Sequence, residues 1–129
     1  MQCFGSILGY PTVGSDEYSR IQVYIAEFLT TFILTMIIFV MTESTPYKRD
    51  IKGPYALCIG AYYGIAILAI GRVTGGALNP ARVFGPLLLS GTIKRHISQY
   101  LIGTLSGGCL GAFFYKSLLK YNYYVAELL

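Results

Sequence analysis

The chain reads TGGALNPARVFGPLLLS from residue 74 to residue 90, and no other segment restricts the possible folds as much. It is apolar enough to enter a bilayer, but a helix from Pro80 to Ser90 would extend only about 16 Å, roughly half the hydrocarbon thickness. Its start is well defined, because Asn79 is a favourable N-cap and Pro80 suits the first helical position. The stretch therefore predicts a half-helix over residues 79–90 that enters from one face and starts near the membrane midplane.

Polar groups gather at the start of this half-helix. A helix N-terminus offers free N–H groups and a partial positive pole, and Arg82 adds a full charge one turn later. An arginine in hydrocarbon costs at least about 2.5 kcal/mol, so Arg82 should face water rather than lipid. Gly75 and Gly76 allow the preceding backbone to pack closely and to point its carbonyls inward. Irregular backbone at this depth is tolerated where it lines a water-filled cavity, which we expect here.

Apolar segments on both sides of the stretch are long enough to cross a membrane. Residues 21–41 contain a single charge, Glu27, and residues 54–71 and 97–115 contain none. Of the 129 residues, only 12% are charged, about half the usual share of a soluble domain. The expected fold is all-α membrane, with three transmembrane helices and one re-entrant half-helix. A surface loop with a solvated arginine would explain the helix cap but not the apolar run that follows it.

Charge and composition argue against other classes. The net charge of +4 is scattered and does not indicate a nucleic-acid partner. Three cysteines without metal-ligand spacing predict neither a metal site nor a cofactor, and one histidine without a neighbouring nucleophile does not suggest an enzyme. Five basic residues fall on each side of the expected membrane; discounting Arg82 leaves a slim bias for residues 42–53 being cytoplasmic. The expected location is an integral, multi-pass position in a membrane that the sequence does not identify.

The run from Thr74 to Pro86 resembles the second signature loop of the aquaporin and aquaglyceroporin family, the major intrinsic proteins. The resemblance includes Glu27 in Ala26-Glu27-Phe28, and it covers the chain from about residue 23 to residue 119. The family is built from two inverted repeats, each with three spans and one re-entrant half-helix, and this chain matches the second. The resemblance implies a passive channel half for water and small uncharged solutes, embedded in a lipid bilayer.

A complete pore would then need a first repeat or a second chain in the opposite orientation. Complete members of the family are expected to be homo-tetramers. The alternative is a non-conducting, truncated or degenerate membrane protein that retains the fold without a pore.

The resemblance also implies roles for individual residues. Asn79 would donate its side-chain amide to a permeating oxygen at the pore centre, and Arg82 would stand in the outer selectivity filter. Water-selective members have histidine at the position of Ile67, so the filter here is expected to be wider and less polar. Glycerol facilitators have aspartate at the position of Val83, which argues against a standard glycerol channel. The implied pore and selectivity residues are Asn79, Pro80, Ala81, Arg82, Gly76 and Ile67.

For two further side chains, Glu27 and Tyr63, the sequence leaves more than one role open. The resemblance implies that Glu27 supports the loop by holding its backbone N–H groups, and a proton-relay acid is the alternative. Tyr63 lies four residues before Ile67 and on the same helix face, where it would supply a pore hydroxyl, obstruct the path, or simply bond to a neighbouring helix.

The other tyrosines and the glycines are expected to be structural. Most tyrosines, including Tyr100, are expected at the headgroup level. Four-residue glycine ladders at 103, 107 and 111 and at 60 and 64 predict close helix packing.

Overall fold

The computed structural model describes residues 18–42, 54–90 and 97–120, and every structural statement below concerns these residues. Residues 43–53, which make up most of the segment expected to be cytoplasmic, lie outside them. The described elements are four α-helices followed by a short π-helix. They are α1 (Arg20–Thr42), α2 (Tyr55–Ile70), α3 (Pro80–Ser90), α4 (Ile97–Phe114) and η2 (Tyr115–Lys120).

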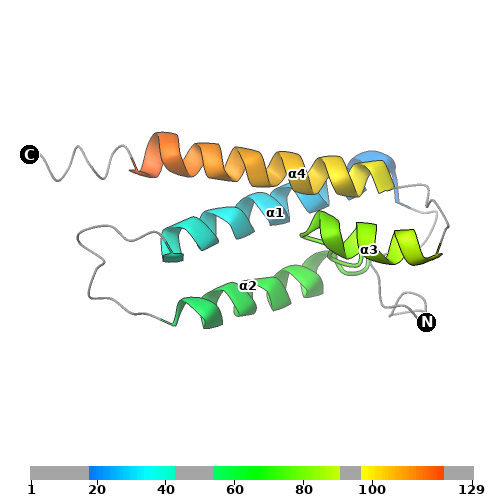
Figure 1. The fold of residues 1–129 in the computed structure, drawn as a ribbon, viewed down its shortest axis with the longest axis horizontal. Helices are drawn as coiled ribbons and strands as arrows, with labels where there is room; N and C mark the ends of the chain where they lie inside the picture. The colour runs from blue at the N-terminus through cyan, green and yellow to red at the C-terminus, as the bar shows by residue number, and fades with distance from the viewer. Residues whose placement is uncertain (1–17, 43–53, 91–96, 121–129) are drawn as a thin grey trace, which may run out of the picture.

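The helices are arranged around the pair formed by α1 and α4, which lie side by side and start at the same end (Figure 1). α2 packs against α1 and runs in the opposite direction. The short helix α3 starts well inside the length of this bundle, contacts α4, and runs outward to the end at which α4 begins (Figure 1). This arrangement confirms the expected all-α class.

Helix length agrees with a membrane fold. α1 and the helix from Ile97 to Leu118 are each long and apolar enough to cross a bilayer, whereas α2 has 16 residues. Sixteen residues extend only about 24 Å, short of the ~30 Å core. Backbone hydrogen bonds continue past Ile70, however, from the amides of Thr74 and Gly75 to the carbonyls of Ile70 and Gly71. The helical path therefore reaches the start of the signature loop.

The contact between α1 and α4 depends on missing side chains. Gly103, Gly107 and Gly111 are buried, and a Cβ added at Gly107 would overlap the carbonyl oxygen of Phe28 on α1. The second ladder makes no such approach to another described helix. Gly60 and Gly64 are exposed, and a Cβ added at either would meet nothing within 4 Å. Among the described helices, this face of α2 turns away from α1 and has no partner to approach.

The loop between α2 and α3 joins the two parts of the core. Ala77 belongs to a buried cluster with Val23, Val83 and Tyr100, which connects α1, α3 and α4. Its neighbour Leu78 belongs to a second cluster, with Leu34 and Ala66, which connects α1 and α2. Consecutive loop residues thus belong to different clusters, and between them they contact the cores formed with all four α-helices.

We predict that Gly107→Ala destabilises the chain by about 1–3 kcal/mol, because the added methyl group forces α1 and α4 apart. The matched control is Gly64→Ala, where the space is open and the change should stabilise the helix by up to about 1 kcal/mol. Unfolding in a denaturing detergent titration, followed by helical circular dichroism, measures both. Equal effects of the two substitutions would contradict the role of close α1–α4 packing.

Candidate functional site

A buried carboxylate holds the centre of the signature loop. Glu27 on α1 is 0% exposed. Its Oε1 accepts a hydrogen bond from the amide of Ala77 at 3.0 Å, and its Oε2 accepts one from the amide of Leu78 at 2.9 Å. Bonds to an ionised acceptor are shorter and stronger than neutral ones. Glu27 thus fixes two consecutive peptide units, one with each carboxylate oxygen.

The loop backbone is strained where it is held. Gly75 and Gly76 have φ values of 79° and 65°, in the left-handed region that favours glycine. Leu78 has a φ of 51°, although a residue with a side chain loses about 1–2 kcal/mol there. The amide of Leu78 is one of the two that Glu27 binds. The carboxylate thus stabilises a conformation that leucine does not favour.

Two side chains to which the sequence assigned no role in holding the loop complete its support. The Thr74 hydroxyl accepts a hydrogen bond from the amide of Gly76 at 3.0 Å. The Tyr100 hydroxyl donates to the carbonyl of Thr74 at 2.6 Å, and Tyr100 is only 3% exposed. Tyr100 thus points into the protein, and its hydroxyl binds a loop carbonyl instead of water, unlike the tyrosine with a wet hydroxyl that the sequence predicted. Its burial follows from the approach of α3 and the loop to α4, which sequence periodicity does not reveal. Only a hydroxyl-bearing residue directly before two glycines hinted at the role of Thr74.

The half-helix starts at Asn79. Its Oδ1 accepts a hydrogen bond from the amide of Ala81 at 2.9 Å, and its carbonyl accepts one from the amide of Arg82 at 3.1 Å. Pro80 occupies the first helical position, where its missing N–H costs no hydrogen bond. The Asn79 side chain is exposed, and within the described part of the chain its NH₂ group has no acceptor.

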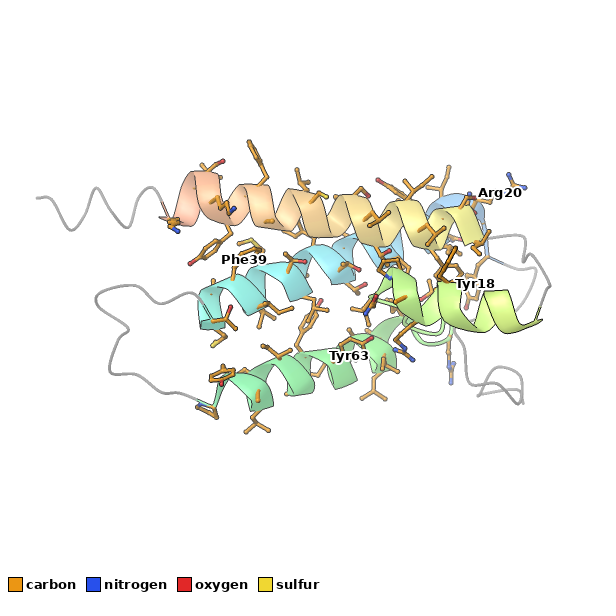
Figure 2. The ribbon with its side chains drawn as sticks, in the orientation of Figure 1. Tyr18, Arg20, Phe39 and Tyr63 are labelled. Atoms are coloured by element: carbon orange, nitrogen blue, oxygen red, sulfur yellow. The ribbon has the colours of Figure 1, made fainter. Side chains whose placement is uncertain are left out.

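Arg82 bends back over the loop instead of extending along α3. Its Nη1 donates to the Tyr63 hydroxyl and to the Gly76 carbonyl, each at 3.0 Å. The guanidinium carbon lies 5.7 Å from the centre of the Tyr63 ring, within range of a cation–π interaction. Figure 2 shows the Tyr63 side chain on the side of α2 that faces α1 and α3.

Four of the residues with an implied pore role lie together, namely Tyr63, Ile67, Gly76 and Arg82. Ile67 touches Gly76 so closely that a Cβ added to the glycine would lie 3.0 Å from the Ile67 Cγ1. Gly76 in turn accepts from Arg82, which bonds to Tyr63. The structure thus gathers residues from α2, the loop and α3, while Asn79 and Ala81 lie exposed at the start of the half-helix.

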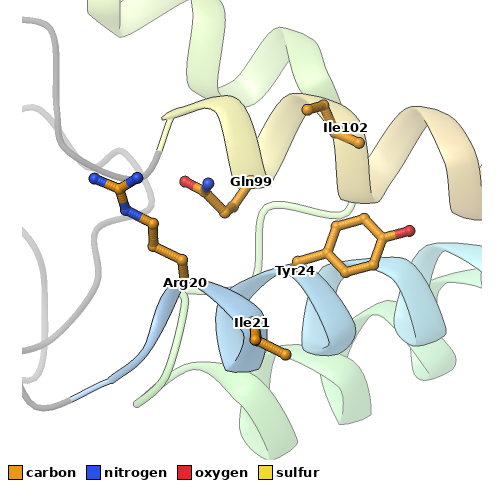
Figure 3. Close-up of a pocket in the computed structure, with 5 residues that line it drawn as sticks. All are labelled: Arg20, Ile21, Tyr24, Gln99 and Ile102. Carbon is orange, nitrogen blue, oxygen red and sulfur yellow. The ribbon is translucent and has the colours of Figure 1, made fainter.

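A shallow groove elsewhere on the surface shares no residue with this site. It lies near the first turns of α1 and α4 (Figure 3). Its position is separate from the loop and from the start of α3, so it contributes nothing to their chemistry. The groove is lined by Arg20, Ile21, Tyr24, Gln99 and Ile102.

The fold and the site define an all-α membrane protein with a re-entrant half-helix whose connecting loop is anchored by a buried acid. The chain belongs to the major intrinsic protein family, whose model matches residues 1–115. Aquaporin TIP2-3 of Arabidopsis thaliana is 32% identical over 139 aligned residues, covering 98% of this chain and 55% of the relative. Aquaporin TIP4-1 of the same plant is 39% identical and covers 91% and 49%. Aquaporin A of Dictyostelium discoideum is 32% identical and covers 82% and 38%. The chain thus spans about half the length, or less, of these curated relatives.

We predict that Glu27→Gln destabilises the loop by about 1.5–3 kcal/mol. The variant keeps the shape but places an NH₂ group against one of the two loop amides. Hydrogen exchange at the amides of Ala77 and Leu78, measured in lipid nanodiscs, should accelerate accordingly.

The control is Thr31→Val, one turn along α1. Thr31 is also buried, but its hydroxyl has no hydrogen-bond partner among the residues that the structure describes, so its replacement should leave exchange in the loop unchanged. Unaltered exchange in Glu27→Gln would show that the carboxylate does not hold the loop.

Proposed function

We propose that this chain forms one half of a passive membrane channel for water and small uncharged solutes. The other half is a first repeat or a second chain in the opposite orientation, and the complete channel assembles as a homo-tetramer. The names of the relatives, which are aquaporins, support the transport of water.

The observation that carries the proposal is a set of unused donors at the start of the half-helix. Arginine has five N–H donors, and Arg82 uses two of them, both on Nη1. The Nε and Nη2 groups of Arg82 and the amide of Asn79 have no acceptor among the described residues. Such groups at membrane depth require water or a polar ligand. A line of permeating water molecules satisfies them.

The side chains beside these donors make the proposed filter wide. Gly76 contributes no side chain, and Ile67 is apolar and half-buried. Val83 is 7% exposed and packs in the core cluster, so it adds no polar group to the path. The filter should therefore pass at least one small neutral solute of the size of urea or ammonia in addition to water, and glycerol poorly.

We predict that Ile67→His in the complete channel lowers urea or ammonia permeability by about tenfold and leaves water permeability largely intact. The imidazole reaches further from the helix than the isoleucine side chain and adds polar groups, and a change in fit worth a methylene group discriminates by about this factor. Position 76 is unsuitable for this test, because its positive φ strains any side chain. Stopped-flow swelling of proteoliposomes measures each solute.

The control is Ile65→His, the same change at a position that is 63% exposed and points about 160° away on the helix.

Vesicles containing this chain alone should swell like empty vesicles, because one half does not close a pore. A complete channel that passes nothing would favour the non-conducting alternative.

We predict that Arg82→Gln in the complete channel raises the permeability to protons or small cations at least about fivefold, because a unit charge at about 4 Å contributes about 1 kcal/mol even in water. Arg72→Gln is the matched control, since Arg72 is exposed beyond the end of α2. Vesicles loaded with a pH-sensitive dye report the leak. A leak of the same size in both variants would argue against Arg82 as the barrier.

A further inference from the structure

Two adjacent tyrosines on α2 use their hydroxyl groups for different purposes. The Tyr62 hydroxyl donates to the carbonyl of Thr30 on α1 at 2.8 Å, which joins two helices. The Tyr63 hydroxyl donates to the carbonyl of Ala77 in the signature loop at 3.1 Å and contacts Arg82. Residues of the same kind thus provide an internal comparison.

The direction of the hydrogen bonds around Tyr63 is fixed by chemistry. A guanidinium has only donors, and a phenol has one proton. Arg82 must therefore donate to the Tyr63 oxygen, and Tyr63 must give its proton to Ala77. The second Nη1 proton of Arg82 goes to the Gly76 carbonyl. The guanidinium is consequently held at one nitrogen by two acceptors.

We propose that Tyr63 is a positioning residue for Arg82 and, through it, a specificity-determining residue of the channel. The tyrosine oxygen and the Gly76 carbonyl hold Nη1 against the loop, so that Nε and Nη2 are the groups presented to a permeating molecule. Tyr63 also occupies the carbonyl of Ala77, which is then not offered as an acceptor along the path. The effect on permeation rests on the proposed channel function, whereas the positioning of Arg82 does not.

The same residue links Arg82 to the buried acid. Ala77 gives its N–H to Glu27 and its carbonyl to Tyr63. A displacement of the loop at Ala77 therefore moves the acceptor on which Tyr63, and hence the guanidinium, depends. Tyr63 transmits the position of the anchored loop to the charged group of the filter.

The first test measures the guanidinium directly in this chain, in lipid nanodiscs, with ¹⁵N-labelled arginine. Rotation about the Nε–Cζ bond of Arg82, which exchanges Nη1 and Nη2, should be slow enough to resolve the two nitrogen signals. In Tyr63→Phe, which keeps the ring, the rotation should accelerate at least about tenfold, since one hydrogen bond to a charged group is lost. Tyr62→Phe is the control and should leave Arg82 unchanged. Averaged signals in the unmodified chain, like those of the exposed Arg72, would overturn the proposal without any variant.

The second test measures selectivity in the complete channel. The ratio of urea to water permeability should rise about fivefold in Tyr63→Phe, the effect of one ordinary hydrogen bond, and should stay constant in Tyr62→Phe. An unchanged ratio with a mobile guanidinium would overturn the role in specificity, and equal changes in both variants would show a general structural effect instead. If the unmodified complete channel conducts nothing, the proposed function fails, and the spectroscopic result still decides whether Tyr63 positions Arg82.

Discussion

The structure depends on the two hydrogen bonds that the Glu27 carboxylate accepts from the loop amides of Ala77 and Leu78. A buried charge without partners is very costly, and so is an irregular backbone whose amides lack acceptors. Glu27, Ala77 and Leu78 solve both problems at once, since two oxygens meet two N–H groups at about 3 Å. Because Ala77 and Leu78 also fill separate core clusters, the same contact sets the positions of α2 and α3 relative to α1.

Tertiary contacts of the loop offset the strain in its backbone. Gly75 and Gly76 adopt positive φ at little cost, but Leu78 does so only because its amide and its side chain are both held. Tyr100 restrains the other end of the loop through the carbonyl of Thr74. The half-helix therefore starts from a loop that is held by hydrogen bonds from other helices, and the Arg82 side chain folds back onto this loop.

Sequence alone was sufficient for the features that are local. The all-α membrane class was predicted correctly from apolar runs and charge, and a cap at Asn79 before Pro80 marked the start of a short helix. Features that depend on a distant neighbour were not accessible in this way. Burial of Tyr100 requires the loop to reach α4, and the open face at Gly60 and Gly64 reflects which side of α2 meets α1. The contact of Tyr63 on α2 with Arg82 on α3 depends on the path of the loop between the two helices, which contains residues with positive φ. The sequence does not define this path, so it left three alternatives for Tyr63.

The side chains of Glu27 and Arg82 bind opposite faces of the same loop. The amides of Ala77 and Leu78 point to the anionic Glu27, whereas the carbonyls of Gly76 and Ala77 are directed to Arg82, the latter through Tyr63. A peptide unit is planar, so its N–H and C=O point in opposite directions. Fixing amides on a buried acid therefore turns carbonyls toward the side where Arg82 lies. The negative charge inside the protein determines the acceptors that hold the positive charge at the proposed path, although the two side chains share no hydrogen bond in the described structure.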